Sequence, residues 1–319
     1  MELVIHKNAP MALVIHNNAL IALAAAASWG GGDFFGGMGV KAAGGETAGA
    51  LRFGIFAQGI SLAALLAVLS LRHPTLPHGA LLVWGLLAGV AAAFSLTAFY
   101  IALSRGAMGA SAAVSGLLAA AIPAVVSSAM EGAPTALRLA GFALAAGAIW
   151  MIAAGPSPEN ADGIKQRGTM ALAIGGGLGF GFYFVALRMD NALGVLEPMA
   201  LARSASLVTC VLLLLAVRLR GREASTGSNG RRSGTMLSRT MLSGTMLIWA
   251  LGVALLDTGG KLLFVAATLR GRLDVAAVLA SLYPAGTILL AAWRLHERPT
   301  RRQFAGMAVA LAAVLMITL

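Results

Sequence analysis

Residues 280–299 read ASLYPAGTILLAAWRLHERP, an apolar run that contains Pro284 near its start and ends in Glu297 and Arg298. Proline has no backbone N–H and kinks a helix, and a membrane helix tolerates this when neighbours or a cavity satisfy the freed carbonyl. The stretch therefore predicts a membrane helix with a kink at Pro284. Glu297 lies just past the apolar run, so we expect it to order a tight turn with Arg298.

The rest of the chain has the same apolar character. Of its 319 residues, 59% are hydrophobic and 11% are charged, and the mean hydropathy is +0.85. A helix needs about 20 apolar residues to cross a bilayer, and the runs here are continuous rather than alternating, which argues against a transmembrane barrel. We predict an all-α integral membrane protein with ten transmembrane helices, at 19–40, 48–71, 79–103, 107–130, 136–154, 168–188, 195–217, 245–269, 273–294 and 301–319.

Sequence patterns recur between the two halves of the chain. IPAVVSSAMEGAPT (122–135) matches YPAGTILLAAWRLHERPT (283–300), each followed by a Gly-Ala-rich run. We therefore divide the chain into repeats at 19–155 and 163–319, with five expected spans each. Five crossings leave the second repeat inverted in the membrane, as in secondary transporters, which place their substrate site near the midplane between the halves.

Two segments fall outside the repeat pattern. Residues 1–18 are an N-terminal extension of mixed polarity, and residues 218–244 form a basic inserted loop that ends in SGTML-type repeats. This composition is typical of a solvated linker, with a regulatory or lipid-binding loop as the alternative.

An acid and a base stand inside the expected eighth span, WALGVALLDTGGKLLFVAATL. Asp257 and Lys261 are four residues apart, so a helix places them on one face within pairing reach. Buried charges are costly in a bilayer and usually face a cavity or one another. Two interpretations stay open: an ion pair that packs a helix junction, or a substrate or proton site. Gly259 and Gly260 lie between the two charges and are candidates for a hinge in that turn.

Two arginines occupy matching positions near the start of spans 2 and 7, in GALRFG (Arg52) and MALARS (Arg203). Long basic side chains near span ends reach to the headgroups, which is one interpretation. The alternative is a cavity-facing arginine that binds a substrate carboxylate.

Other candidates for the lining of a cavity lie in spans 1, 3 and 6. Asp33 is an intramembrane acid in WGGGDFFGG, and we expect it either in a vestibule or at a helix end. Trp29, Tyr100 and Tyr183 are candidate aromatic lining, with plain packing as the alternative. The glycines around Asp33 and in GGGLGFGF (175–182) predict close-packed helix surfaces or hinges.

Several classes of function lack their residue patterns. The glycine runs lack phosphate-loop spacing, the single Cys210 supplies no disulfide or cysteine-based zinc site, and no His/Asp metal spacing or Ser-His-acid set lies in the spans. We expect no cofactor, no metal and no enzyme activity. The formal net charge of +11 comes mostly from loops beside the spans, so we expect a lipid bilayer and not nucleic acid as partner.

The chain resembles the EamA-type transporters of the drug/metabolite transporter superfamily. The resemblance rests on SLYPAGTILLAAWRLHERPT and FAGMAVALAAVLMI, and more weakly on SWGGG and ALRFG. It implies export or exchange of small metabolites, amino acids or drug-like compounds across the cytoplasmic membrane, without ATP hydrolysis. It also implies a central cavity lined by spans 1, 3, 4, 6, 8 and 9, and both termini in the cytoplasm.

The first half departs from this pattern. Pro123 precedes Glu131 by eight residues, whereas Pro284 precedes Glu297 by thirteen, so the kink of span 4 is displaced and Glu131 has no following arginine. The basic residues beside the spans favour termini outside the cell, against the family's orientation. We leave the orientation open.

The resulting hypothesis is a secondary transporter of small molecules, multi-pass in the plasma membrane, that works by alternating access as a monomer or homodimer. The alternatives are a non-transporting membrane scaffold or sensor and, more remotely, a lipid scramblase or membrane enzyme.

Overall fold

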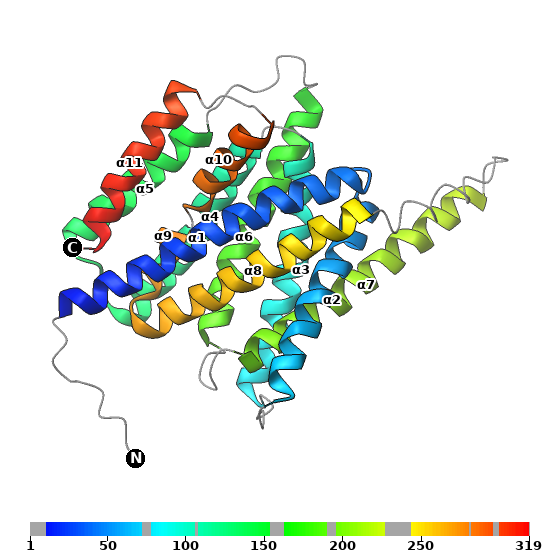
Figure 1. Cartoon of the computed structure of the whole chain (residues 1–319), viewed down its shortest axis with the longest axis horizontal. Helices are drawn as coiled ribbons and strands as arrows, with labels where there is room; N and C mark the ends of the chain where they lie inside the picture. Colours follow the sequence, from blue (N-terminus) through cyan, green and yellow to red (C-terminus); the bar gives the residue numbers. More distant parts are fainter. Residues whose placement is uncertain are drawn as a thin grey trace.

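The computed structural model describes residues 11–71, 78–105, 108–153, 163–189, 196–226, 244–280, 282–295 and 300–318. These ranges consist of helices joined by short turns, which confirms the all-α prediction for this part of the chain (Figure 1). The helices are α1 (Met11–Ala42), α2 (Thr47–Leu69), α3 (Ala80–Ser104), α4 (Met108–Glu131), α5 (Ala136–Ala153), α6 (Gly163–Met189), α7 (Leu196–Thr226), α8 (Gly244–Arg270), α9 (Leu273–Ala280), α10 (Tyr283–Leu295) and α11 (Arg301–Thr318).

Seven segments of the described chain are long and apolar enough to cross a membrane: Asn18–Ala42, Thr47–Leu69, Ala80–Ser104, Arg167–Met189, Leu196–Arg220, Gly244–Arg270 and Val275–Arg294. The helices α4, α5 and α11 coincide with three further expected spans. The apolar stretches found in the first two, Val114–Met130 and Ala136–Ala148, are shorter. A multi-pass membrane protein is therefore established, while the total of ten crossings stays a prediction.

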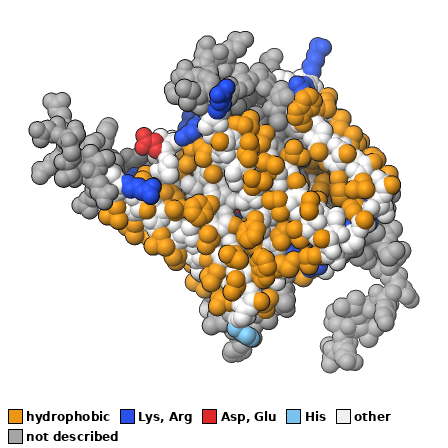
Figure 2. Space-filling model, turned by 180° about the vertical axis from the view of Figure 1, so that it is seen from behind, with side chains coloured by type: hydrophobic (Ala, Val, Ile, Leu, Met, Phe, Trp, Pro, Cys, Tyr) orange, Lys and Arg blue, Asp and Glu red, His pale blue; other side chains and the backbone are white. Residues whose placement is uncertain are grey.

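The surface has the character that this conclusion requires. Large apolar side chains are exposed along several helices, among them Val125, Leu255 and Trp293. Figure 2 shows one face of the molecule covered by apolar side chains, with the few visible charges near its edges. Lipid tails are the environment in which such a surface costs nothing.

The helix contacts follow a two-fold pattern, in which the main contacts of α1–α5 with α6–α11 have equivalents when the two halves are interchanged. The most extensive contacts join α1 to α8 and α3 to α6, which are the same pair if α1–α5 are exchanged with α6–α11. The contacts of α3 with α7 and of α2 with α8 form another exchanged pair, while α5 packs on α11 at one side of the molecule (Figure 1). The contacts thus have the symmetry that two repeats would give, and the two inverted repeats stay a prediction.

The glycine-rich stretches are close-packed surfaces, as predicted. A Cβ atom at Gly30 of α1 would lie 2.6 Å from the carbonyl oxygen of Tyr283 and 2.9 Å from the Cα of Gly286, both in α10. A Cβ at Gly177 of α6 would lie 2.7 Å from the carbonyl oxygen of Ser115 in α4. Only hydrogen fits at these places, so the glycines set how closely the backbones approach.

The expected ninth span is interrupted. Its first part is α9, which ends at Ala280, and its second part is α10, which starts at Tyr283 with Pro284 in its first turn. Proline is tolerated there because the first turn of a helix has no partner for its N–H groups. Pro123 behaves differently, because α4 continues through it from Met108 to Glu131.

Two segment boundaries differ from expectation. The helix α1 begins at Met11, so part of the predicted extension is helical, and residues 1–10 lie outside the described ranges. The helix α7 continues to Thr226, past the expected start of the loop at residue 218, because RLRGREAST still contains good helix formers. The remainder of that loop, residues 227–243, is not among the described residues.

We predict that Gly30→Ala lowers the free energy of unfolding by about 1–3 kcal/mol, because the new methyl group meets backbone atoms that cannot rotate away. Thermal unfolding of the detergent-purified protein measures this. Gly175→Ala is the matched control, since a Cβ there meets no atom within 4 Å. Equal stability of the two variants would show that the α1–α10 crossing is not closely packed.

Candidate functional site

An acid on α8 binds two bases deep in the bundle. The Oδ2 atom of Asp257 lies 2.8 Å from Nζ of Lys261 and 2.7 Å from Nη2 of Arg203 on α7. All three side chains are buried. The spacing predicted the first pair. Arg203 is 3% exposed and points inward to Asp257, so its side chain does not reach to the headgroups.

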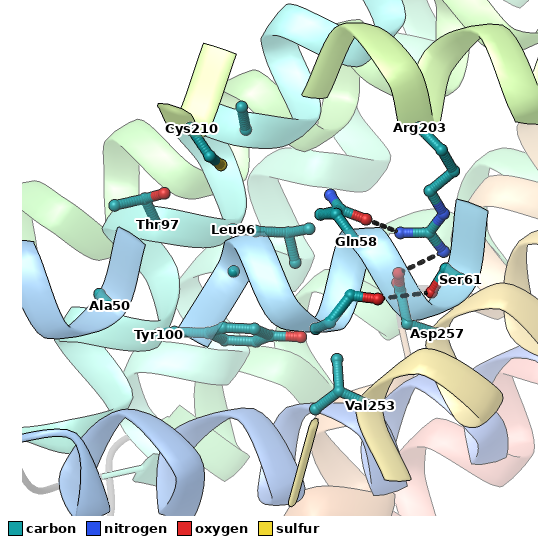
Figure 3. A pocket seen from close by; sticks show the side chains of 13 residues that line it. Ala50, Gln58, Ser61, Leu96, Thr97, Tyr100, Arg203, Cys210, Val253 and Asp257 are labelled. Atoms are coloured by element: carbon teal, nitrogen blue, oxygen red, sulfur yellow. Dashed lines mark hydrogen bonds and ion pairs between the residues drawn. The ribbon is translucent and has the colours of Figure 1, made fainter. Parts of the chain in front are cut away.

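Neutral groups from both halves complete this cluster. Arg203 donates to Oε1 of Gln58 on α2 and, over 2.9 Å, to Oγ1 of Thr258. Gln58 in turn donates from Nε2 to Oγ of Ser206 over 2.6 Å. Figure 3 shows Arg203 reaching from α7 between Gln58 and Asp257. A buried guanidinium carries several donors, so these partners lower the cost of its burial.

Lys261 also faces an aromatic ring. Its Nζ atom lies 5.1 Å from the centroid of Tyr183 on α6. Beside it, Trp29 of α1 stacks on Phe184 of α6 with centroids 5.1 Å apart and planes at 11°, and Phe264 of α8 packs against both. The Nε1 atom of Trp29 donates to the backbone carbonyl of Asp257 over 3.4 Å. The aromatic residues therefore join α1, α6 and α8 next to the charges.

A narrow cavity lies between these groups, with room for about two water molecules. Its lining comes from α1 and α3 of the first half and from α6, α8 and α10 of the second: Trp29, Asp33, Leu96, Phe180, Tyr183, Phe184, Asp257, Lys261 and Tyr283. The helices are those that the family resemblance implied, except that no residue of α4 is among this lining. Five of the candidates thus meet at one cavity: Trp29, Asp33, Tyr183, Asp257 and Lys261.

Asp33 differs from the other charged groups of this cavity. It is 7% exposed, and among the residues that the structure describes its carboxylate has neither a hydrogen bond nor an ion pair. It follows Trp29 by four residues on α1, so both side chains share the cavity-facing side of that helix. The glycines between them face elsewhere, Gly30 to α10 and Gly31 and Gly32 to α8.

A second narrow cavity lies on the far side of the charged cluster, between α2, α3, α7 and α8 (Figure 3). Tyr100 lines this cavity rather than the first, together with Gln58, Arg203 and Cys210. Asp257 and Leu96 border both cavities. The prediction that Tyr100 lines a cavity fits, but it does not share one with Trp29.

Other candidates do not join the site. Arg52 is half-buried and lines neither cavity. The helix α8 is continuous at Gly259 and Gly260, and a Cβ at Gly260 would lie 2.6 Å from Trp29, so a hinge there stays a prediction. Gly260 therefore admits an aromatic ring.

The predicted turn residues fall at the limits of the described chain. Glu131 ends α4 and its side chain is not described, while Glu297 and Arg298 lie outside the described ranges. Over those ranges, no group of three His, Cys, Asp or Glu side chains is placed to hold a metal ion.

Sequence reasoning missed Gln58, Thr258, Phe184, Phe264 and Tyr283. The polar Gln58 inside an apolar span was a usable signal, since such amides bond across helices in membranes. The aromatic residues gave none, because phenylalanine and tyrosine occur equally as packing and as cavity lining.

Comparison with known proteins supports a single family. Residues 167–319 match the model of the EamA-like transporter family. A solved structure described only as "Crystal structure of protein" aligns over 95% of this chain and 98% of its own length, with a TM-score of 0.64 and 16% identity. At that identity the likeness shows the fold alone. No curated protein sequence matches the chain.

The cluster yields a test of stability. Asp257→Asn leaves Arg203 and Lys261 without an anion, so we expect the free energy of unfolding to fall by about 3–5 kcal/mol. Lys261→Gln keeps the pair of Asp257 with Arg203 and should cost clearly less. Thermal unfolding in detergent compares the two, and an equal loss in both variants would contradict this account.

Proposed function

We propose that the chain is a secondary transporter of small molecules that works by alternating access, because residues 167–319 match the model of the EamA-like transporter family. The family indicates a membrane transporter of the drug/metabolite type. Export or exchange of metabolites, amino acids or drug-like compounds, location in the plasma membrane, and a monomeric or homodimeric state are parts of the proposal.

The observation that carries the proposal is the position of the first cavity. Helices of both halves line it, and it contains charged groups far from the ends of the spans. Ionisable side chains that persist inside a membrane protein mark substrate or ion pathways. Its small size corresponds to a closed conformation, which must widen on one side to admit a substrate.

The bonds around the cavity favour movement between the halves. Both ion pairs of Asp257 lie within the second half, so they can move as one body. The contacts across the halves include hydrogen bonds from Arg203 to Gln58, from Ser61 to the Ala254 carbonyl, and from Thr287 to the Gly30 carbonyl. Each such bond contributes only about 0.5–1.5 kcal/mol net, or about 1.5–3 kcal/mol when one partner is charged, so a rocking motion need not break an ion pair.

The roles in transport follow from this arrangement. We assign Asp257 and Lys261 to contact with the substrate or a coupling proton, and Arg203 to holding Asp257 in place from α7. Trp29 and Tyr183 supply the apolar walls. The closely packed glycines of α1 and α6 provide surfaces that slide without rearranging side chains.

The test is a screen of cells that overexpress the chain for tolerance to metabolites and drugs, followed by flux of the hit compound in proteoliposomes. Lys261→Gln is the main variant, because Asp257 retains Arg203 and the fold should survive. We expect at least tenfold lower flux. Glu46→Gln is the matched control, since Glu46 is an exposed charge at the start of α2.

Wild-type flux by a well-folded Lys261→Gln variant would remove Lys261 from the mechanism. Absence of any flux by the wild-type chain across the screen would favour the scaffold or sensor alternative.

A further inference from the structure

Asp33 on α1 makes no ion pair, and this indicates which charge a ligand of the cavity should carry. Lys261 is bound by Asp257 and covered by the ring of Tyr183, and Arg203 is bound by Asp257, Gln58 and Thr258. These positive charges have partners. Asp33 is the charged group of this lining whose carboxylate makes no hydrogen bond or ion pair within the described residues, although it interacts electrostatically with Lys261 and Asp257.

A buried ionised carboxylate without an ion pair is costly, and either a bound proton or a cation relieves that cost. The walls around it determine which kind of cation fits. Trp29, Phe180, Phe184 and Tyr283 offer aromatic faces and few oxygen atoms. Metal ions such as Na⁺ or Ca²⁺ need several oxygen ligands, whereas an organic ammonium group binds one carboxylate and aromatic faces together.

We infer that Asp33 is the recognition site for a protonated amine, and that the transported substrates include amines carried on a planar apolar body. The ammonium group occupies the small space beside Asp33, and the apolar body lies against Trp29 and Phe184 once the cavity widens. This inference rests on the proposed function, because it names the substrate class of the same site.

The geometry assigns separate roles to the two acids of the cavity. Asp257 is bound by two cations of the chain, so besides its assigned contact with substrate or a coupling proton it also holds the cluster together. Asp33 has no structural bond to lose, so its replacement by the isosteric asparagine should leave the empty protein folded and at least as stable. The two acids are therefore separable by experiment.

The experiment measures binding to the detergent-purified full chain by isothermal titration and thermal shift. The probes are benzylamine, phenethylamine and tryptamine, with 2-phenylethanol and 3-phenylpropionate as neutral and anionic counterparts of phenethylamine. We expect one or more amines to bind the wild type. Asp33→Asn should weaken that binding by roughly ten- to a hundredfold, through loss of a charge-assisted bond.

The control is Glu46→Gln, which makes the same acid-to-amide change at an exposed position and should bind amines as the wild type does. Binding of 2-phenylethanol should be weak and equal in the wild type and Asp33→Asn. The inference is overturned if no amine binds, if Asp33→Asn binds amines unchanged, or if 3-phenylpropionate binds as tightly as phenethylamine.

Binding is measured without transport, so the two proposals fail separately. Amine binding that depends on Asp33, in a chain that moves no compound, would overturn the transporter proposal and leave the site standing. Transport of other compounds without amine binding would do the reverse.

Discussion

The carboxylate of Asp257 holds two cations among apolar helices, and much of the surrounding arrangement follows from that constraint. Arg203 approaches from α7 and Lys261 from one turn along α8, so a single acid links two helices that otherwise pack little against each other. Gln58 and Thr258 accept hydrogen bonds from the two terminal nitrogens of Arg203, while its Nε atom has no partner within the described residues. Desolvated charges tolerate little misplacement, so the cluster is a rigid centre around which the apolar packing is arranged.

The close packing of the apolar helices depends on glycines, which have a hydrogen atom in place of a side chain. Gly30 brings α1 against α10, and Gly31 and Gly32 bring it against α8. The same short stretch places Trp29 and Asp33 on its remaining side. The helix α1 therefore packs closely against both α10 and α8 and still presents the ring of Trp29 and the carboxylate of Asp33 to the cavity. This is possible because the three residues between them are glycines without side chains.

The sequence predicted those parts of the site that depend on spacing along one helix. The pair of Asp257 and Lys261 follows from a separation of four residues, and the interruption near Pro284 follows from the missing N–H. Arg203 was open to two interpretations because its depth depends on where α8 passes, which is a tertiary fact. Pro123 shows the same limit, since its helix continues where that of Pro284 stops. The aromatic walls were beyond prediction, because three separate helices must meet to form them.

The interruption between α9 and α10 also acts on the electrostatics of the cavity. A helix that starts inside the protein points unpaired N–H groups inward, and its aligned peptide dipoles give that end a partial positive charge. The helix α10 starts at Tyr283, which lines the same cavity as Asp33. The backbone thus places the positive end of α10 beside the lining of the cavity, a contribution that no count of side-chain charges would reveal.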